Sequence, residues 1–196
     1  MDIAQLILLI PVLLFSLSIH EYSHGKMADL LGDPTPEMTG RLTLNPLAHL
    51  DLMGTLVLLF TQRFGWAKPV RVDPRYFDDP KQGMMYVGLA GPASNILMAI
   101  LLAGLFNSLA FVLPPVVLIF LQLGVGINLG LAIFNLLPVP PLDGSKILAG
   151  FLPRKYDSII YQLEAYGPFV LLFLVFTGVL GNIIGPIWFF FYRLLL

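Results

Sequence analysis

Long apolar segments that carry almost no charge dominate this sequence. Uncharged residues run from Ile3 to Ile19, and further apolar blocks cover residues 84–113, 115–138 and 169–196. As helices, the longer blocks can cross the roughly 30 Å hydrocarbon core of a bilayer. Only 12% of the residues are charged, about half the fraction usual in soluble domains. The chain is therefore predicted to be a multipass protein embedded in a lipid bilayer.

The expected fold is an all-α membrane bundle that forms a single domain over residues 1–196. A first helix is predicted over residues 1–31, where Gly32, Pro34 and Pro36 end it. The remaining parts are a polar region (32–83), two core helices (84–113 and 115–138), a segment with a short surface helix (139–168) and a C-terminal membrane segment (169–196) in which Gly181 to Pro186 could form a break or hairpin.

The polar region is predicted to contain a small membrane-associated β element between the first and second spanning helices. Residues 40–46 and 68–74 each hold a short alternating stretch, as a strand would. Residues 52–60 are apolar but too few to cross a bilayer straight, so they are interpreted as re-entrant.

Basic residues predict the orientation in the membrane. They lie between the first helix and residue 84 and again after residue 138, whereas the connection near Pro114 has none. The set comprises Lys26, Arg41, Arg63, Lys68, Arg71, Arg75, Lys81, Lys146, Arg154 and Lys155. By the positive-inside rule these segments face the cytoplasm, and the N-terminus lies outside the cell membrane.

A possible catalytic motif ends the first apolar run, in "HEYSH" at residues 20–24. His20 and His24 are i and i+4 on a helix, so both imidazoles can bind one zinc ion. Glu21 can take a proton from an activated water and return it to a leaving amine. The alternative is a set of interfacial polar residues, which is disfavoured because ionisable groups inside a membrane are costly.

A catalytic zinc site needs a third protein ligand, and the sequence offers two candidates. Asp143 in "NLLPVPPLDG" directly follows an apolar helix that should end on the same side as His24. It could equally be the N-cap of a following short helix. The rival is His49, which lies in the polar region near the start of the 52–60 segment.

Taken together, "HEYSH", "GPASN" (91–95) and "NLLPVPPLDG" (135–144) resemble the site-2 proteases, a family of intramembrane zinc metalloproteases. "GRLTLNPLAHLD" and "GWAKPV" are similar to the small bacterial branch, without PDZ or CBS domains. The resemblance implies that His20, His24 and Asp143 bind one Zn²⁺ per chain and that Glu21 is the catalytic acid/base. It also implies that Asn95 and Asn135 lie near the site, positioning substrate or steadying the oxyanion.

The expected substrate is a transmembrane protein or peptide, such as a membrane-tethered regulator or a leftover signal peptide. Its helix must be held extended for cleavage, and an edge strand could do this by pairing with its backbone. The candidate strand comprises Arg41, Leu42, Thr43, Leu44 and Asn45. The net charge of −1 argues against a nucleic-acid partner, and the absence of cysteine excludes thiol chemistry.

Two other functions use similar residues. A metal transporter could use the His/Asp set as a transit site, but it would not need the proton shuttle that Glu21 offers. A membrane zinc protease that trims lipidated C-termini would also carry HExxH, but the "PPLDG" segment argues against that class.

Overall fold

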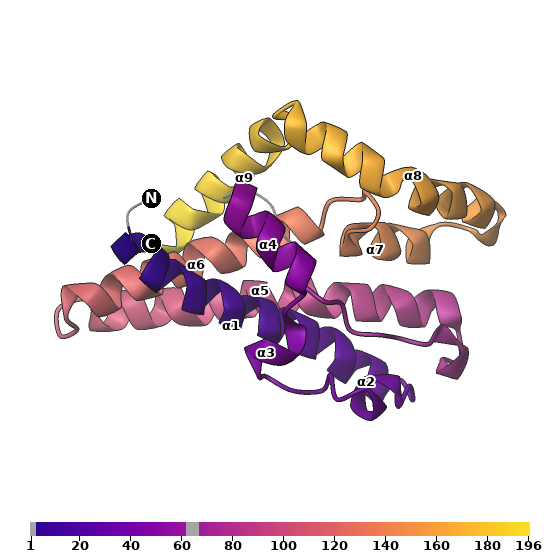
Figure 1. Cartoon of the computed structure of the whole chain (residues 1–196), viewed down its shortest axis with the longest axis horizontal. Coiled ribbons are helices and arrows are strands. Elements are labelled where there is room, and N and C mark those ends of the chain that lie inside the picture. Colours follow the sequence, from indigo (N-terminus) through magenta and orange to yellow (C-terminus); the bar gives the residue numbers. More distant parts are fainter. Residues whose placement is uncertain (1–2, 62–66) are drawn as a thin grey trace.

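The computed structural model describes residues 3–61 and 67–196. Its core consists of the helices α1 (Ile3–Leu30), α5 (Pro80–Leu109) and α6 (Pro115–Asn135), which lie side by side (Figure 1). The chain runs along α5 in the opposite direction to α1 and α6. All three are long and apolar enough to cross a membrane, which confirms the expected multipass helical bundle.

Proline begins both later core helices. Pro80 and Pro115 occupy first-turn positions, where the missing N–H costs no hydrogen bond. Asp79 caps α5, because its side chain accepts hydrogen bonds from the backbone amides of Lys81 and Gln82. The first turn of α5 is polar, and the prediction used only the apolar block that starts at residue 84. The predicted helix therefore began four residues later than α5 does.

Small side chains bring α5 and α6 close together. Ala99 and Ala103 of α5 pack against Val125 and Leu129 of α6 in a fully buried cluster. Small residues are common where membrane helices approach closely, because the two backbones then gain more van der Waals contact.

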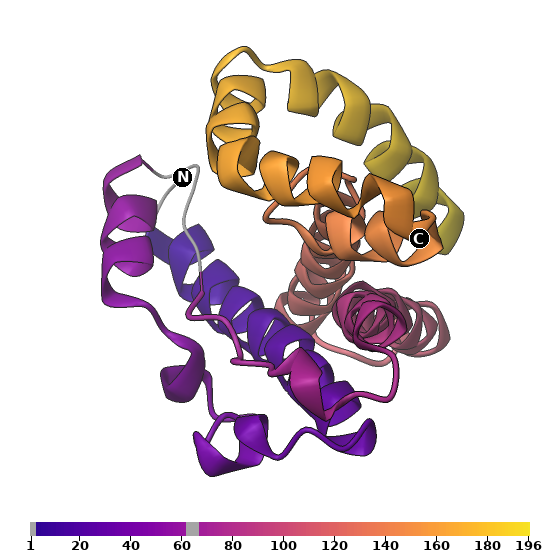
Figure 2. The ribbon, with the colours of Figure 1, turned by 90° about the vertical axis from the view of Figure 1, so that its right-hand side faces the viewer.

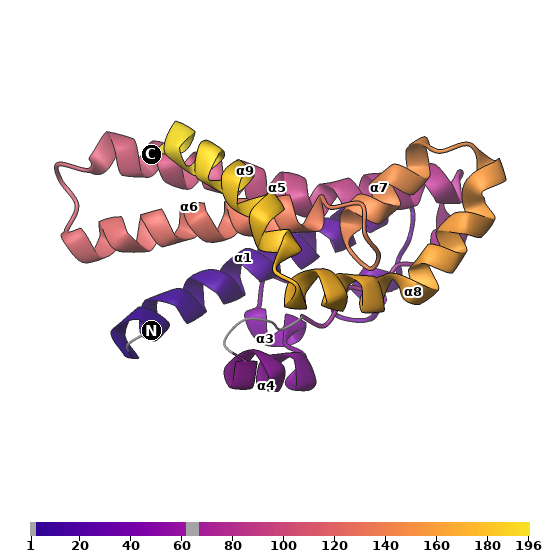
Figure 3. The same ribbon diagram turned by 90° about the horizontal axis from the view of Figure 1, so that it is seen from above.

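The polar region winds along one side of the bundle through α2 (Thr35–Met38), α3 (Pro46–His49), α4 (Leu52–Thr61) and the short helix η1 (Pro74–Tyr76). Figure 2 shows α2, α3 and α4 on the α1 side of the core. Helix α4 is ten residues long, about 15 Å, or half the hydrocarbon thickness. A helix of this length is too short to cross the bilayer straight, and Figure 3 shows α4 set apart from the core helices.

The predicted β element is wrong. Across the described ranges 3–61 and 67–196 no strand forms, and one isolated antiparallel bridge joins Leu50 to Ala67. The proposed substrate strand, Arg41 to Asn45, is an irregular loop before α3.

Hydrogen bonds with side chains replace the expected strand pairing. The Thr43 hydroxyl accepts from the Asn45 amide, and the Asn45 side chain caps α3 by accepting from Leu47. In the second stretch, the Val70 amide bonds to Glu21 and the Asp73 amide to Asp33. In the first stretch, short polar side chains that bond nearby backbone groups compete with sheet formation, and in the second stretch two distant carboxylates bind the backbone amides that a strand would pair.

The C-terminal third contains α7 (Asp143–Phe151), the short helix η2 (Arg154–Tyr156), α8 (Asp157–Phe176) and α9 (Val179–Leu195). The turn between α8 and α9 lies at Thr177 and Gly178, earlier than the Gly181–Pro186 stretch considered from sequence. Gly178 adopts φ +76, a left-handed conformation that favours glycine at a helix end. The expected surface helix at 157–166 is the first half of α8.

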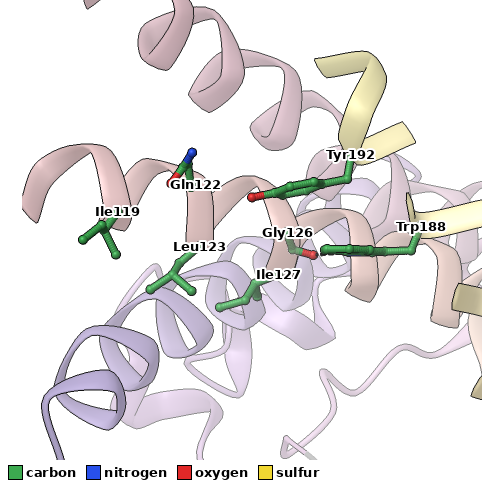
Figure 4. Close-up of a pocket in the computed structure, with 7 residues that line it drawn as sticks. All are labelled: Ile119, Gln122, Leu123, Gly126, Ile127, Trp188 and Tyr192. Atoms are coloured by element: carbon green, nitrogen blue, oxygen red, sulfur yellow. Dashed lines mark hydrogen bonds between the residues drawn. The ribbon is translucent and has the colours of Figure 1, made fainter. Parts of the chain in front are cut away.

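Helix α9 packs against α6 beside a pocket of about 420 Å³. The Trp188 indole N–H donates to the carbonyl of Gly126, and Tyr192 stacks on Trp188 (Figure 4). The pocket wall also includes Ile119 and Leu123 of α6. It lies on the face of α6 that meets α9, and it contains none of the residues of the HEYSH motif.

Candidate metal centre

Two histidines of α1 face the interior of the bundle. His20 and His24 are 4% and 7% exposed, so both imidazoles are withdrawn from the surroundings of the protein. Their rings meet edge to face, with 4.6 Å between centroids, and 3.0 Å separates the two Nε2 atoms. The i, i+4 spacing thus gives the shared face that the sequence predicted.

Asp143 brings a carboxylate to the same point. Its Oδ2 atom lies 3.1 Å from Nε2 of His20 and 3.1 Å from Nε2 of His24. The residue that caps α7 is Leu142, and Asp143 is the first residue inside the helix. The N-cap alternative considered for Asp143 is therefore wrong, and its side chain is directed at the histidines.

Two glycines permit these close approaches. A Cβ atom on Gly91 of α5 would lie 2.5 Å from the His24 ring and 2.7 Å from the His20 ring. A Cβ on Gly144 would lie 2.2 Å from the carbonyl oxygen of Leu136 at the end of α6. Without a side chain at Gly91, the backbone of α5 can contact the two imidazoles. Without one at Gly144, the first turn of α7 can pack against the C-terminal end of α6.

Hydrogen bonds at the outer ring nitrogens orient both imidazoles. His24 Nδ1 lies 2.7 Å from the carbonyl oxygen of Val87, which can only accept, so Nδ1 carries the hydrogen. His20 Nδ1 lies 2.6 Å from Oδ1 of Asn95. Each neutral imidazole therefore presents the lone pair of Nε2 to the centre of the cluster.

The three inner atoms form a donor set that suits zinc. Two imidazole lone pairs and a carboxylate oxygen, all within 3.0–3.1 Å of one another, repel unless a cation lies among them. Ligands held tetrahedrally at about 2.0–2.1 Å from one zinc ion are about 3.3 Å apart, close to the spacing found. His20, His24 and Asp143 are all buried and can converge on one metal ion.

A cation lies beside the carboxylate of Asp143. Lys146 Nζ lies 3.1 Å from Oδ1, the oxygen that faces away from the histidines. One carboxylate oxygen thus faces the cluster while the other is held by a cation.

Glu21 lies beside the histidines and contacts the polar region. Its Oε2 atom accepts a hydrogen bond of 3.0 Å from the backbone amide of Val70. The side chain is half-buried, unlike the neighbouring His20. Sequence reasoning did not predict this contact, because nothing in the sequence connects residue 70 to α1.

The two asparagines predicted to lie near the site, Asn95 and Asn135, differ in their contacts. Asn95 is fully buried against His20, and its amide nitrogen donates to the Ser16 carbonyl and to Asn128 Oδ1, which uses both hydrogens. Asn135 is half-buried and donates to the Leu131 carbonyl on its own helix. The geometry therefore connects Asn95, but not Asn135, directly to a histidine.

His49, the rival third ligand, is buried away from the cluster of His20, His24 and Asp143. Its Nε2 atom lies 2.8 Å from the carbonyl oxygen of Thr43, within the loop that precedes α3. Asn128 of α6 is a polar residue near the site that sequence reasoning did not single out, and it bonds Asn95.

Known proteins resemble the chain over most of its length. It is 36% identical over 183 residues to the Bacillus subtilis protein named "Putative zinc metalloprotease YwhC", a match that covers 89% of this chain and 82% of that protein. It is 31% identical over 195 residues to "Putative zinc metalloprotease Rip2" of Mycolicibacterium smegmatis, covering 94% and 70%. A methanogen protein, MJ0611 of Methanocaldococcus jannaschii, is 41% identical over 79 residues, which cover 39% of this chain and 36% of that protein.

A family model agrees with these relatives. The model of peptidase family M50 matches residues 115–177, the part that contains α6, Asp143 and α7. No solved structure matches the chain significantly. On the strength of these relatives and of the family model, the chain belongs to the site-2 protease family, peptidase family M50, of membrane zinc metalloproteases.

Proposed function

We propose that the protein is an intramembrane endopeptidase that hydrolyses peptide bonds within transmembrane substrates. In this proposal His20, His24 and Asp143 hold the zinc ion and Glu21 is the acid/base. The observation that carries it is the convergence of three ligand atoms within 3.0–3.1 Å of one another, directly beside Glu21. A transport site would need the ligands but not the adjacent carboxylate.

Zinc bound by these residues supplies Lewis-acid activation of water and of the scissile carbonyl. Glu21 accepts a proton from the attacking water and delivers it to the nitrogen of the leaving amine. Glu21 directly follows His20 in α1. The Val70 amide holds one carboxylate oxygen, so the second oxygen is the one that handles the proton.

The depth of the site supports a membrane-embedded substrate. His20 and His24 belong to the candidate span Ile7–Leu30, in the half nearer its C-terminal end. A soluble substrate would have to enter the bilayer to reach a site within a membrane helix, whereas a transmembrane segment is already at that depth. A membrane-tethered regulator and a leftover signal peptide both meet this description.

The distribution of charge supports an opening toward the cytoplasm across the cell membrane. Lys26, Lys81 and Lys146 lie at the end of the bundle where α1 ends, α5 begins and α7 follows α6. That end faces the cytoplasm by the positive-inside rule, and the N-terminus then lies outside. Arg193 lies near the end of α9 and departs from this pattern, while Arg63 lies outside the described residues.

Asn135 is the better of the two predicted asparagines for contacting substrate. It is the last residue of α6 and is partly accessible. Only its amide nitrogen is engaged, with Leu131, and that local contact can be exchanged for a substrate carbonyl. The amide hydrogens of Asn95 are both committed inside the protein.

The test is a comparison of membrane proteomes from three strains of the source organism. One strain lacks the gene, one expresses Glu21→Gln, and one expresses Glu37→Gln, a control at an exposed glutamate of α2. Intact transmembrane proteins should accumulate in the first two strains and not in the third. Identical membrane proteomes in all three strains, under conditions in which the protein is expressed, would contradict the proposal.

A further inference from the structure

A buried polar network connects the metal centre to α6. It comprises Ser16 and His20 of α1, Asn95 of α5 and Asn128 of α6, none of them more than 4% exposed. Polar side chains at such depth in a membrane bundle need partners, and the partners of Ser16, Asn95 and Asn128 are other members or backbone carbonyls. The network therefore joins all three core helices at the level of His20.

The direction of every hydrogen bond in the network is determined. Asn128 Nδ2 lies 2.8 Å from the carbonyl oxygen of Gly124, an atom that can only accept, and 2.9 Å from the Ser16 hydroxyl oxygen. This orients the Asn128 amide, so its Oδ1 atom faces Asn95. Nδ2 of Asn95 donates to that oxygen at 2.8 Å.

The orientation of Asn95 then determines the tautomer of His20. Nδ2 of Asn95 also donates to the Ser16 carbonyl oxygen at 3.3 Å, so only its Oδ1 atom is left for His20. That oxygen lies 2.6 Å from His20 Nδ1 and can only accept. A flipped Asn95 would direct an N–H at Nδ1 and favour the tautomer that carries its hydrogen on Nε2, and that tautomer could not bind a metal through Nε2.

We propose that Asn128 is a positioning residue of the metal centre: through Asn95 it holds His20 in the tautomer whose Nε2 lone pair faces the ion. His24 needs no such relay, because the Val87 backbone carbonyl already determines its tautomer. The inference rests on the proposed role of His20 as a ligand. It adds to that role a residue on a third helix whose hydrogen bonds are to Asn95, Ser16 and Gly124 and not to a proposed ligand.

The competing explanation is that Asn128 only holds the helices together, as polar residues often do in membranes. Helix adhesion predicts a loss of stability and no change in the His20 ring. The relay predicts a change in the His20 tautomer even in metal-free protein. The two explanations therefore differ in an observable that needs neither zinc nor enzyme activity.

The experiment uses full-length protein labelled with ¹⁵N-histidine and purified in lipid. With three histidines in the chain, the ring-nitrogen signals can be assigned by substitution. Metal-free wild type should show His20 as the Nδ1–H tautomer, and Asn128→Leu should show a mixture of tautomers. Zinc affinity, measured by competition with a chelator, should fall about 10-fold in Asn128→Leu, at the lower end of the range for residues that orient a ligand.

Two controls separate the relay from helix adhesion. Asn107→Leu removes another interhelical amide, which donates to the Leu195 carbonyl of α9, and should leave the His20 tautomer and zinc affinity unchanged. Asn95→Asp combined with Asn128→Leu should recover most of the affinity, because either carboxylate oxygen can accept from His20 Nδ1. If Asn128→Leu does not fold, the His20 tautomer and the zinc affinity are measured in Asn128→Ala instead.

An unchanged His20 tautomer with normal zinc affinity in folded Asn128→Leu would overturn the relay and leave the proposed function intact. Affinity loss accompanied by an equal fall in thermal stability, without rescue by Asn95→Asp, would also overturn it in favour of helix adhesion. Failure of wild-type protein to bind zinc through His20 would instead contradict the proposed function itself.

Discussion

The carboxylate of Glu21 accepts a hydrogen bond from the backbone amide of Val70, with 3.0 Å between Oε2 and N. The contact attaches the irregular segment before α5 to the C-terminal half of α1. It holds one oxygen of Glu21 in place, and catalysis by a carboxylate depends strongly on such positioning.

Removing the amide of Val70 should therefore impair catalysis and spare the metal. Val70→Pro deletes the donor, and kcat for cleavage of a model transmembrane substrate should fall about 10- to 100-fold. Zinc content should stay normal, because no ligand is touched. Val70→Ala keeps the amide and serves as the matched control, and equal activities of the two variants would refute a role for this contact.

A second prediction concerns the space beside the histidines. Gly91→Ala should lower zinc affinity by at least about 10-fold, since its Cβ would overlap both imidazole rings and displace them. Gly104→Ala, on the same helix, meets nothing within 4 Å and should bind zinc as wild type does. Chelator competition on both purified variants decides the point, and normal affinity in Gly91→Ala would mean that the rings are not packed as described.

The identity of the third ligand gives another prediction. Asp143→Ala should lose most bound zinc, because two histidines alone leave the ion weakly held. His49→Ala should retain it, because the His49 ring lies against the Thr43 carbonyl. Elemental analysis of both proteins measures this directly, and zinc loss in the His49 variant alone would reverse the assignment.

Local motifs could be predicted from the sequence because the relative positions of their residues are determined within a single helix. The spacing of His20 and His24 determines a shared face wherever α1 lies, and the long apolar blocks determine the three core helices. Asp143 needed more than spacing, because its approach depends on how the chain turns after α6. The resemblance to a known family provided that link, and the structure brings its carboxylate to both histidines.

Features that depend on distant partners could not be predicted. The alternation of residues 41–44 suggested a strand, but the described part of the chain holds no partner strand, and the side chains of Thr43 and Asn45 bond their own loop instead. Asn128 was not singled out, because its contacts with Ser16 and Asn95 come from helices far away in the sequence. The Glu21–Val70 contact was missed for the same reason.

Purified Glu21→Gln tests the central claim most directly, when its zinc content and its cleavage of a model transmembrane substrate are measured beside those of wild type. The account predicts one zinc ion per chain in both proteins. It also predicts that the variant cleaves at least about 10²- to 10⁴-fold more slowly, because an amide cannot accept a proton from water. Wild-type cleavage should stop in chelator and return with added zinc. A zinc-loaded Glu21→Gln protein that cleaves at nearly the wild-type rate would contradict the account.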